Sequence, residues 1–132
     1  MSEEASCRSL RVMVVDDNPG NLLLMEALLE TFGVEPVTMS NPHEAYDALQ
    51  HGGFDLVLMD VRMPGMSGLE LTDKIRALEH QTGRPRTRIV ALTASTMSLA
   101  ECTKHDMDGV LSKPIDRTAL KAGLDRWARP GQ

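Results

Sequence analysis

The sequence lacks the features that define several large classes of protein. It has only two cysteines, Cys7 and Cys102, which are too few for a disulfide framework and fit a reducing cytoplasm. Neither belongs to a set of four cysteines and histidines at zinc-ligand spacing. No apolar run approaches the roughly 20 residues that a membrane span requires, and the polar start "MSEEASCRS" does not resemble a signal peptide. We therefore expect a cytoplasmic protein that makes no direct contact with a membrane.

An excess of positive charge is also missing. The 132 residues carry 14 Lys and Arg against 19 Asp and Glu, a net charge of −5, which argues against nucleic acid as a direct partner. The length and the 42% hydrophobic content predict one globular domain with a substantial core. We expect this domain at residues 9–128, between a polar leader at 1–8 and a short tail at 129–132.

Short apolar runs alternate with helical patterns along the chain. Five runs predict strands: "RVMVV" (11–15), "VEPVTM" (34–39), "FDLVLM" (54–59), "RIVAL" (88–92) and "GVL" (109–111). Four polar signals predict helix starts, namely Asn18-Pro19, Asn41-Pro42, "SGLE" (67–70) and "SLAE" (98–101), and a fifth helix follows from the stripe Leu120, Leu124 and Trp127. The order βαβαβαβαβα predicts an α/β fold, a doubly wound parallel sheet with helices on both faces. Residues 79–88 read as a loop-like insertion.

Polar side chains follow the predicted strands where ligands bind in such sheets, at the carboxyl edge. The stretch "LRVMVVDDN" ends the first strand on two adjacent carboxylates, Asp16 and Asp17. Asp60 follows the third strand, Thr93 the fourth and Lys113 the fifth. If the first and third strands are neighbours, Asp17 and Asp60 face each other. The like charges then need a partner to compensate their repulsion and lost hydration.

A hard divalent cation would supply that compensation. Oxygen-only ligands suit Mg²⁺, which is usually held by one or two carboxylates while it keeps several waters. A phosphoryl group on Asp60 would complete the site, with the cation, Lys113 and the Thr93 hydroxyl each at one of its oxygens.

The set "VVDDN", "DLVLMDVRMPGMSGLE", "ALTA" and "LSKPI", in this order and at these intervals, resembles the response-regulator receiver domains of two-component signalling. The resemblance implies the flavodoxin-like strand order 2-1-3-4-5. It also implies that Asp60 is the phosphoacceptor and that Mg²⁺, or Mn²⁺ in its place, binds Asp17, Asp60 and the main-chain carbonyl of Arg62. Asp16 would bind the ion through water.

The same resemblance gives Thr93 and Lys113 the role of sensing the phosphoryl group, and a cis peptide bond to Lys113-Pro114. "ALTASTM", Cys102 and "MDGVLSKPI" resemble receivers of hybrid histidine kinases in particular. The expected partner is then a histidine kinase or a histidine phosphotransfer domain. The receiver would be a monomer that catalyses its own phosphorylation and dephosphorylation without being an enzyme in the usual sense.

Other functions of this fold fit the sequence less well. A haloacid-dehalogenase phosphatase needs a second acid two residues after its nucleophile, where this chain has Arg62. A flavin or nucleotide module needs a phosphate-binding loop where Asp16 and Asp17 would repel a phosphate. A stand-alone response regulator and a pseudo-receiver that is never phosphorylated remain open.

Two positions depart from the family pattern. Val110 stands where well-known receivers have an aromatic residue or His, and a valine has no ring with which to switch. Asp106 stands where many relatives have Gly, so we expect it to adopt a left-handed backbone conformation.

Overall fold

A computed structural model describes residues 10–51, 53–63, 65–93 and 104–128. The expected leader, the tail, both cysteines and the helix start at 98–101 lie outside these residues. None of the helices described is long and apolar enough to cross a membrane.

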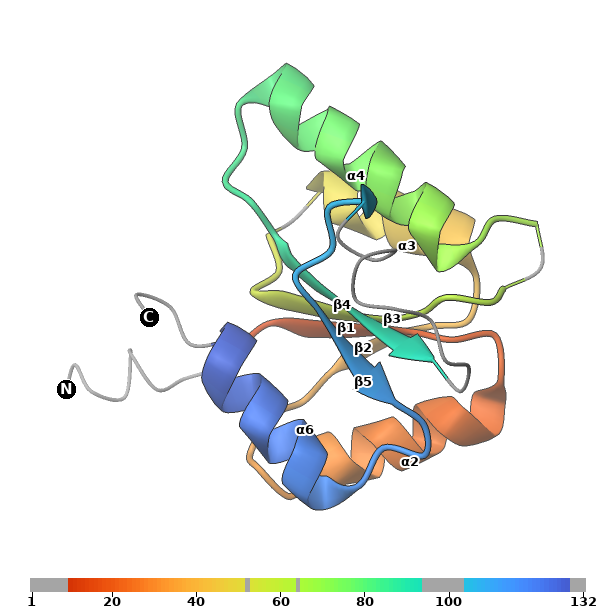
Figure 1. The fold of residues 1–132 in the computed structure, drawn as a ribbon, viewed down its shortest axis with the longest axis vertical. Helices are drawn as coiled ribbons and strands as arrows, with labels where there is room; N and C mark the ends of the chain where they lie inside the picture. Colours follow the sequence, from red (N-terminus) through yellow and green to blue (C-terminus); the bar gives the residue numbers. More distant parts are fainter. Residues whose placement is uncertain (1–9, 52, 64, 94–103, 129–132) are drawn as a thin grey trace, which may run out of the picture.

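Five parallel strands form one sheet in the order β2-β1-β3-β4-β5, as the resemblance implied (Figure 1). The strands are β1 (Val12–Val15), β2 (Val37–Met39), β3 (Leu56–Asp60), β4 (Arg88–Thr93) and β5 (Gly109–Ser112). All residues of β1 and β3 are buried. Burial on both faces explains why β1 is entirely apolar and why β3 is apolar except for its last residue, Asp60.

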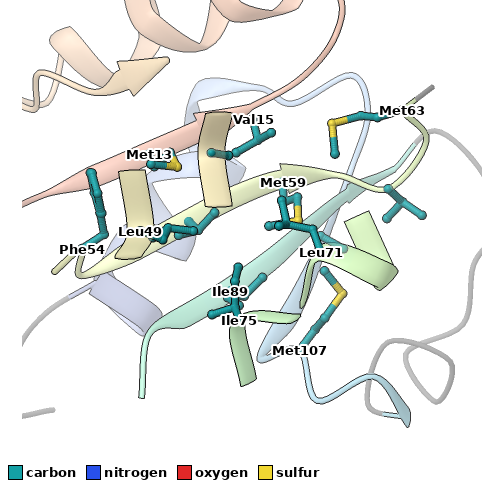
Figure 2. Packing of buried hydrophobic residues seen from close by; sticks show 14 of the residues in the cluster. Met13, Val15, Leu49, Phe54, Met59, Met63, Leu71, Ile75, Ile89 and Met107 are labelled. Carbon is teal, nitrogen blue, oxygen red and sulfur yellow. The ribbon is translucent and has the colours of Figure 1, made fainter. Parts of the chain in front are cut away.

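In the part of the chain that the structure describes, a pair of helices covers each face of the sheet (Figure 1). The helices are α2 (Pro19–Glu30) and α6 (Arg117–Gly123) on one face, and α3 (Pro42–His51) and α4 (Gly68–Thr82) on the other. Alternate residues of each strand point to opposite faces. Met13 and Met59 therefore join the core under α3 and α4, which Figure 2 shows, whereas Val12 and Leu58 join the core under α2 and α6.

The helix starts follow the polar signals in the sequence. The Asn18 and Asn41 side chains accept hydrogen bonds from the first backbone N–H groups of α2 and α3. Ser67 and Glu70 form a complete capping box at α4, and Asp116, which was not anticipated, caps α6.

The predicted start of the loop-like insertion at 79–88 was wrong. Residues 79–82 belong to α4, which ends at Thr82 and is capped by Gly83 in the left-handed conformation (φ 70°), so the connection to β4 is only residues 83–87. The last helix also changes pitch, because α6 continues into a π-helical turn, η1 (Leu124–Ala128). Within η1, the ring of Trp127 packs against two glycines, Gly109 at the start of β5 and Gly123 at the end of α6.

Candidate functional site

The five polar residues predicted at the strand ends all lie at the carboxyl edge of the sheet. Asp16 and Asp17 directly follow β1, and Asp60 is the last residue of β3, its neighbour in the sheet. Thr93 is the last residue of β4 and is buried, and Lys113 directly follows β5. The parallel order of the strands is what brings residues from four distant segments to one place.

The three carboxylates form one cluster. Each of Asp16, Asp17 and Asp60 offers an oxygen, and these oxygens lie within 4.8 Å of one another. Asp16 and Asp60 are buried, at 1% and 7% exposure, whereas Asp17 is exposed. Burial raises the pKa of Asp60, and the nearby charge of Asp16 raises it further. The folded chain therefore holds three like-charged carboxylates close together in a site that is partly shielded from water.

Lys113 partly offsets this charge. Its Nζ lies 3.2 Å from Asp16 Oδ2 and 3.3 Å from Asp60 Oδ1, and its side chain is mostly buried. Its backbone N–H donates to the carbonyl of Thr93, which ties the loop after β5 to the end of β4. The Lys113-Pro114 peptide bond is cis, as the resemblance implied. One ammonium group beside three carboxylates leaves the cluster negative.

The two adjacent acids differ in how the protein holds them. Asp16 accepts hydrogen bonds from the backbone N–H of Asn18 and from the side chain of Asn21. Asp17 forms no side-chain hydrogen bond or ion pair with any residue in the described ranges. Its exposed carboxylate is therefore the one most available to an ion.

Sequence reasoning missed two residues that shape the site. Asn21 appeared only as part of a helix, although its position five residues after Asp16, in the first turn of α2, was visible. Gly68 starts α4 directly against the end of β3, where a Cβ atom would lie 2.4 Å from the carbonyl oxygen of Asp60. Its N–H also donates to the carbonyl of Val61. Only glycine allows this close approach.

The donor set fits a hard divalent cation. All three candidate ligands are carboxylate oxygens. The backbone N–H of Arg62 donates to Asp60 Oδ1 at 3.3 Å, so the loop that carries the Arg62 carbonyl folds back beside the same carboxylate. The residues present suit Mg²⁺, and a cation would neutralise the charge that Lys113 leaves.

The response regulator receiver domain model matches residues 12–125. The chain belongs to this family. The receiver is 44% identical over 124 residues to sensor protein GacS of Pseudomonas syringae pv. syringae, covering 92% of this chain and 14% of that protein. The chain therefore spans a small part of the length of this curated relative.

Solved receivers share the fold. The receiver domain of sensor histidine kinase PA1611 from Pseudomonas aeruginosa PAO1, which holds a magnesium ion in its active-site cleft, is 31% identical with a TM-score of 0.80. That match covers 91% of this chain and 98% of the other. A chain in the complex of Ypd1 with the Ssk1 receiver of Saccharomyces cerevisiae is 28% identical with a TM-score of 0.83, covering 91% and 89%. The expected resemblance to receivers of sensor kinases is confirmed.

The two departures from the family pattern are visible in this receiver. Asp106 has a φ of 66°, so it takes the left-handed conformation expected of a residue in a glycine position. Val110 lies in β5, is partly buried and packs against the core under α3 and α4. As a small side chain already in contact with that core, Val110 cannot move a ring between buried and exposed positions.

Proposed function

We propose that this receiver takes a phosphoryl group from a phosphohistidine onto Asp60 in a Mg²⁺-dependent reaction. The observation that carries the proposal is a buried carboxylate, Asp60, with two further carboxylates and the Lys113 ammonium beside it. Asp16, Asp17, Asp60 and the Arg62 carbonyl would hold the ion, with Asp17 and Asp60 as its direct carboxylate ligands. Mn²⁺ has the same preference for oxygen ligands and would substitute.

The chemistry requires little beyond positioning and charge neutralisation. A carboxylate oxygen of Asp60 forms a bond to phosphorus as the bond from phosphorus to the histidine nitrogen breaks. The electron pair of that bond stays on the imidazole, which leaves neutral or takes a proton from solvent. When bound, the cation stabilises negative charge on the phosphoryl oxygens. Lys113 lies where its ammonium would pair with one of those oxygens, and Thr93 would donate its hydroxyl to another.

The partner we propose is a histidine kinase or a histidine phosphotransfer domain. One matched structure is a complex of the phosphotransfer protein Ypd1 with a receiver, which supports this class of partner. Beside the site lies a pocket of about 250 Å³, with Leu24, Met25 and Ile115 among its lining residues, and Leu23 is 67% exposed nearby on α2. An apolar surface next to the acceptor suits protein docking better than binding of a small polar donor.

We further propose that residues 9–128 form one module of a hybrid sensor histidine kinase, on the cytoplasmic side of the membrane. The support is that the chain aligns with a small part of a much longer sensor protein. The sensor proteins and sensor kinases among the curated relatives favour this module over a stand-alone regulator or an unphosphorylated pseudo-receiver.

Labelling with a small acyl phosphate tests the central claim. With Mg²⁺ and acetyl phosphate, intact-mass spectrometry should find one added phosphoryl group that hydroxylamine removes. Asp60→Asn should abolish the gain, and Asp47→Asn, an exposed aspartate on α3, should leave it unchanged. Full labelling of the Asp60→Asn variant would contradict the assignment of the acceptor.

A further inference from the structure

Asp16 is the carboxylate of the site whose lone pairs the protein itself uses. Its Oδ1 accepts from the backbone N–H of Asn18 at 2.9 Å. Its Oδ2 accepts from Asn21 Nδ2 and from Lys113 Nζ, both at 3.2 Å. An ionised carboxylate has about four lone-pair positions, so three of them are occupied before any ion binds. Both positions on Oδ2 are occupied, so direct coordination through Oδ2 would require Asn21 or Lys113 to give way.

Of these three donors, Asn21 is the one whose side chain has no second role in the site. The N–H of Asn18 is fixed by the start of α2, and Lys113 also pairs with Asp60. The amide of Asn21 reaches Asp16 from the first turn of α2, and both residues line the pocket beside the site. Its bond to Oδ2 turns that oxygen toward α2.

We propose that Asn21 is a positioning residue that keeps Asp16 out of direct contact with the cation and thereby favours Mg²⁺ over Ca²⁺. The inference rests on the proposed function only in assuming that the carboxylate cluster binds a divalent ion. Mg²⁺ requires near-octahedral geometry, retains several waters and binds one or two carboxylates, whereas Ca²⁺ takes six to eight oxygens in a flexible arrangement. Holding back the third carboxylate suits the smaller ion.

Loss of the amide should release Asp16 Oδ2 toward the ion. In Asn21→Ala we expect the ratio of the Ca²⁺ to the Mg²⁺ association constant to rise about fivefold over the native chain, the scale of a coupling between two contacting side chains. Alanine is the better helix former, so weakened α2 would not explain the change. Isothermal titration calorimetry with each cation alone measures both constants without any phosphorylation.

A double-mutant cycle separates positioning from a general change of charge. Asp16→Asn should weaken Ca²⁺ binding more in the Asn21→Ala background than in the native chain. Asn21→Gln, which keeps an amide donor on a longer side chain, should restore part of the native ratio. Glu26→Ala, a partly buried position on α2 outside the site, should leave the ratio unchanged. Fluorescence of Trp127, the only tryptophan, checks that each variant is folded.

The outcomes for the two proposals are distinct. An unchanged ion ratio, or strictly additive effects of Asn21→Ala and Asp16→Asn, would overturn the role of Asn21 even if Asp60 is phosphorylated normally. Coupling between the two positions in a chain that acetyl phosphate never labels would overturn the proposed function and leave the role of Asn21 standing. A native chain that binds neither cation would overturn both.

Discussion

Two carboxylate clusters in this receiver are built from similar groups and behave in opposite ways. The site cluster holds Asp16, Asp17 and Asp60 with the single ammonium of Lys113. The arginine cluster, which we define as Arg76, Glu79, Arg86, Asp106 and Asp108, joins α4, the α4–β4 connection and the segment before β5. In it Arg76 reaches Glu79 at 2.9 Å and Asp108 at 3.0 Å, and Arg86 reaches Asp106 and Asp108 at 3.1 and 3.0 Å.

The difference between the clusters lies in how far the chain completes each one. The three carboxylates of the arginine cluster form ion pairs with two guanidinium groups. In addition, the backbone N–H of Thr87 donates to Glu79 and that of Ile89 donates to Asp108. Hydrogen bonding to Arg86 lowers the pKa of Asp106, whereas burial raises the pKa of Asp60. The arginine cluster therefore stabilises the charged form of an acid, and the site cluster destabilises it. An excess of negative charge that the groups in the described ranges do not fully offset indicates a binding site.

Removal of Asp108 should have the largest effect on stability. The side chains of Asp108 and Arg76 are only 15% and 12% exposed, so Asp108→Ala would remove the acceptor of Arg76 Nη2 and of the Ile89 N–H in a nearly buried place. Arg76 would keep its ion pair with Glu79. We expect a loss of about 3 kcal/mol in the free energy of unfolding. Urea unfolding followed by Trp127 fluorescence measures it. Lys121→Ala, which breaks the exposed Lys121–Asp125 pair, should lose less than about 1 kcal/mol. Equal losses would show that the arginine cluster is no more than a surface network.

The opposite sign is expected at the site cluster. Because the pKa of Asp60 is raised in the folded state, its contribution to stability is present below the ordinary value of 3.8 and is lost as the pH rises through the folded pKa. At pH 7 without a divalent cation, Asp60→Asn should therefore be more stable than the native chain. The same urea titrations at pH 4 and pH 7 should show the advantage only at the higher pH.

Added Mg²⁺ should reverse that order. An ion that binds the folded state stabilises it by mass action, and Asp60→Asn removes one of its carboxylates. In saturating Mg²⁺ the native chain should gain more stability than the variant. An Asp60→Asn chain that is less stable than native under both conditions would mean that Lys113 already compensates the cluster.

The site cluster was accessible from the sequence, and the arginine cluster was not. Each polar residue of the site ends an apolar run or lies within two residues of its end. A parallel sheet alone therefore brings these residues to one edge: Asp16, Asp17, Asp60, Thr93 and Lys113. Arg76, Arg86 and Asp108 lie in a helix and two connections, and no periodic pattern predicts that their side chains meet. Asn21 and Gly68 were missed for a related reason, because each acts through one short contact that depends on the docking of a helix.

Local chemistry also explains which boundaries the sequence predicted. The capping residues Asn18, Asn41 and Ser67 marked three helix starts, since each satisfies backbone N–H groups within its own segment. The end of α4 was misplaced because residues 79–82 continue the helix without apolar periodicity. There the Glu79 carboxylate is held by Arg76 and the N–H of Thr87, tertiary contacts that stabilise the last turn.

The smallest expected effect is at Asp106, where charge and backbone conformation are separable. Asparagine tolerates the left-handed conformation that Asp106 adopts, so Asp106→Asn removes the charge alone. The side chain is 60% exposed, and we expect a loss of only a few tenths of a kcal/mol above pH 5, the range of exposed ion pairs. Because the pKa of Asp106 is lowered by Arg86, that stability is present above 3.8 and is lost as the pH falls through the folded pKa, so the two chains should converge in acid.

The stability of Asp106→Gly should be close to native, because relief of left-handed strain offsets the lost contacts with Arg86. Asp106→Ala should be the least stable of the three variants, by about 1 kcal/mol relative to the glycine variant, because alanine keeps the strain and loses the contacts. Urea titrations of the three variants at pH 4 and pH 7 give this order. If Asp106→Asn lost as much stability as Asp108→Ala, the exposed edge of the arginine cluster would matter as much as its buried centre. The two clusters would then differ only in the number of cationic groups that offset their carboxylates, and burial would not explain the difference.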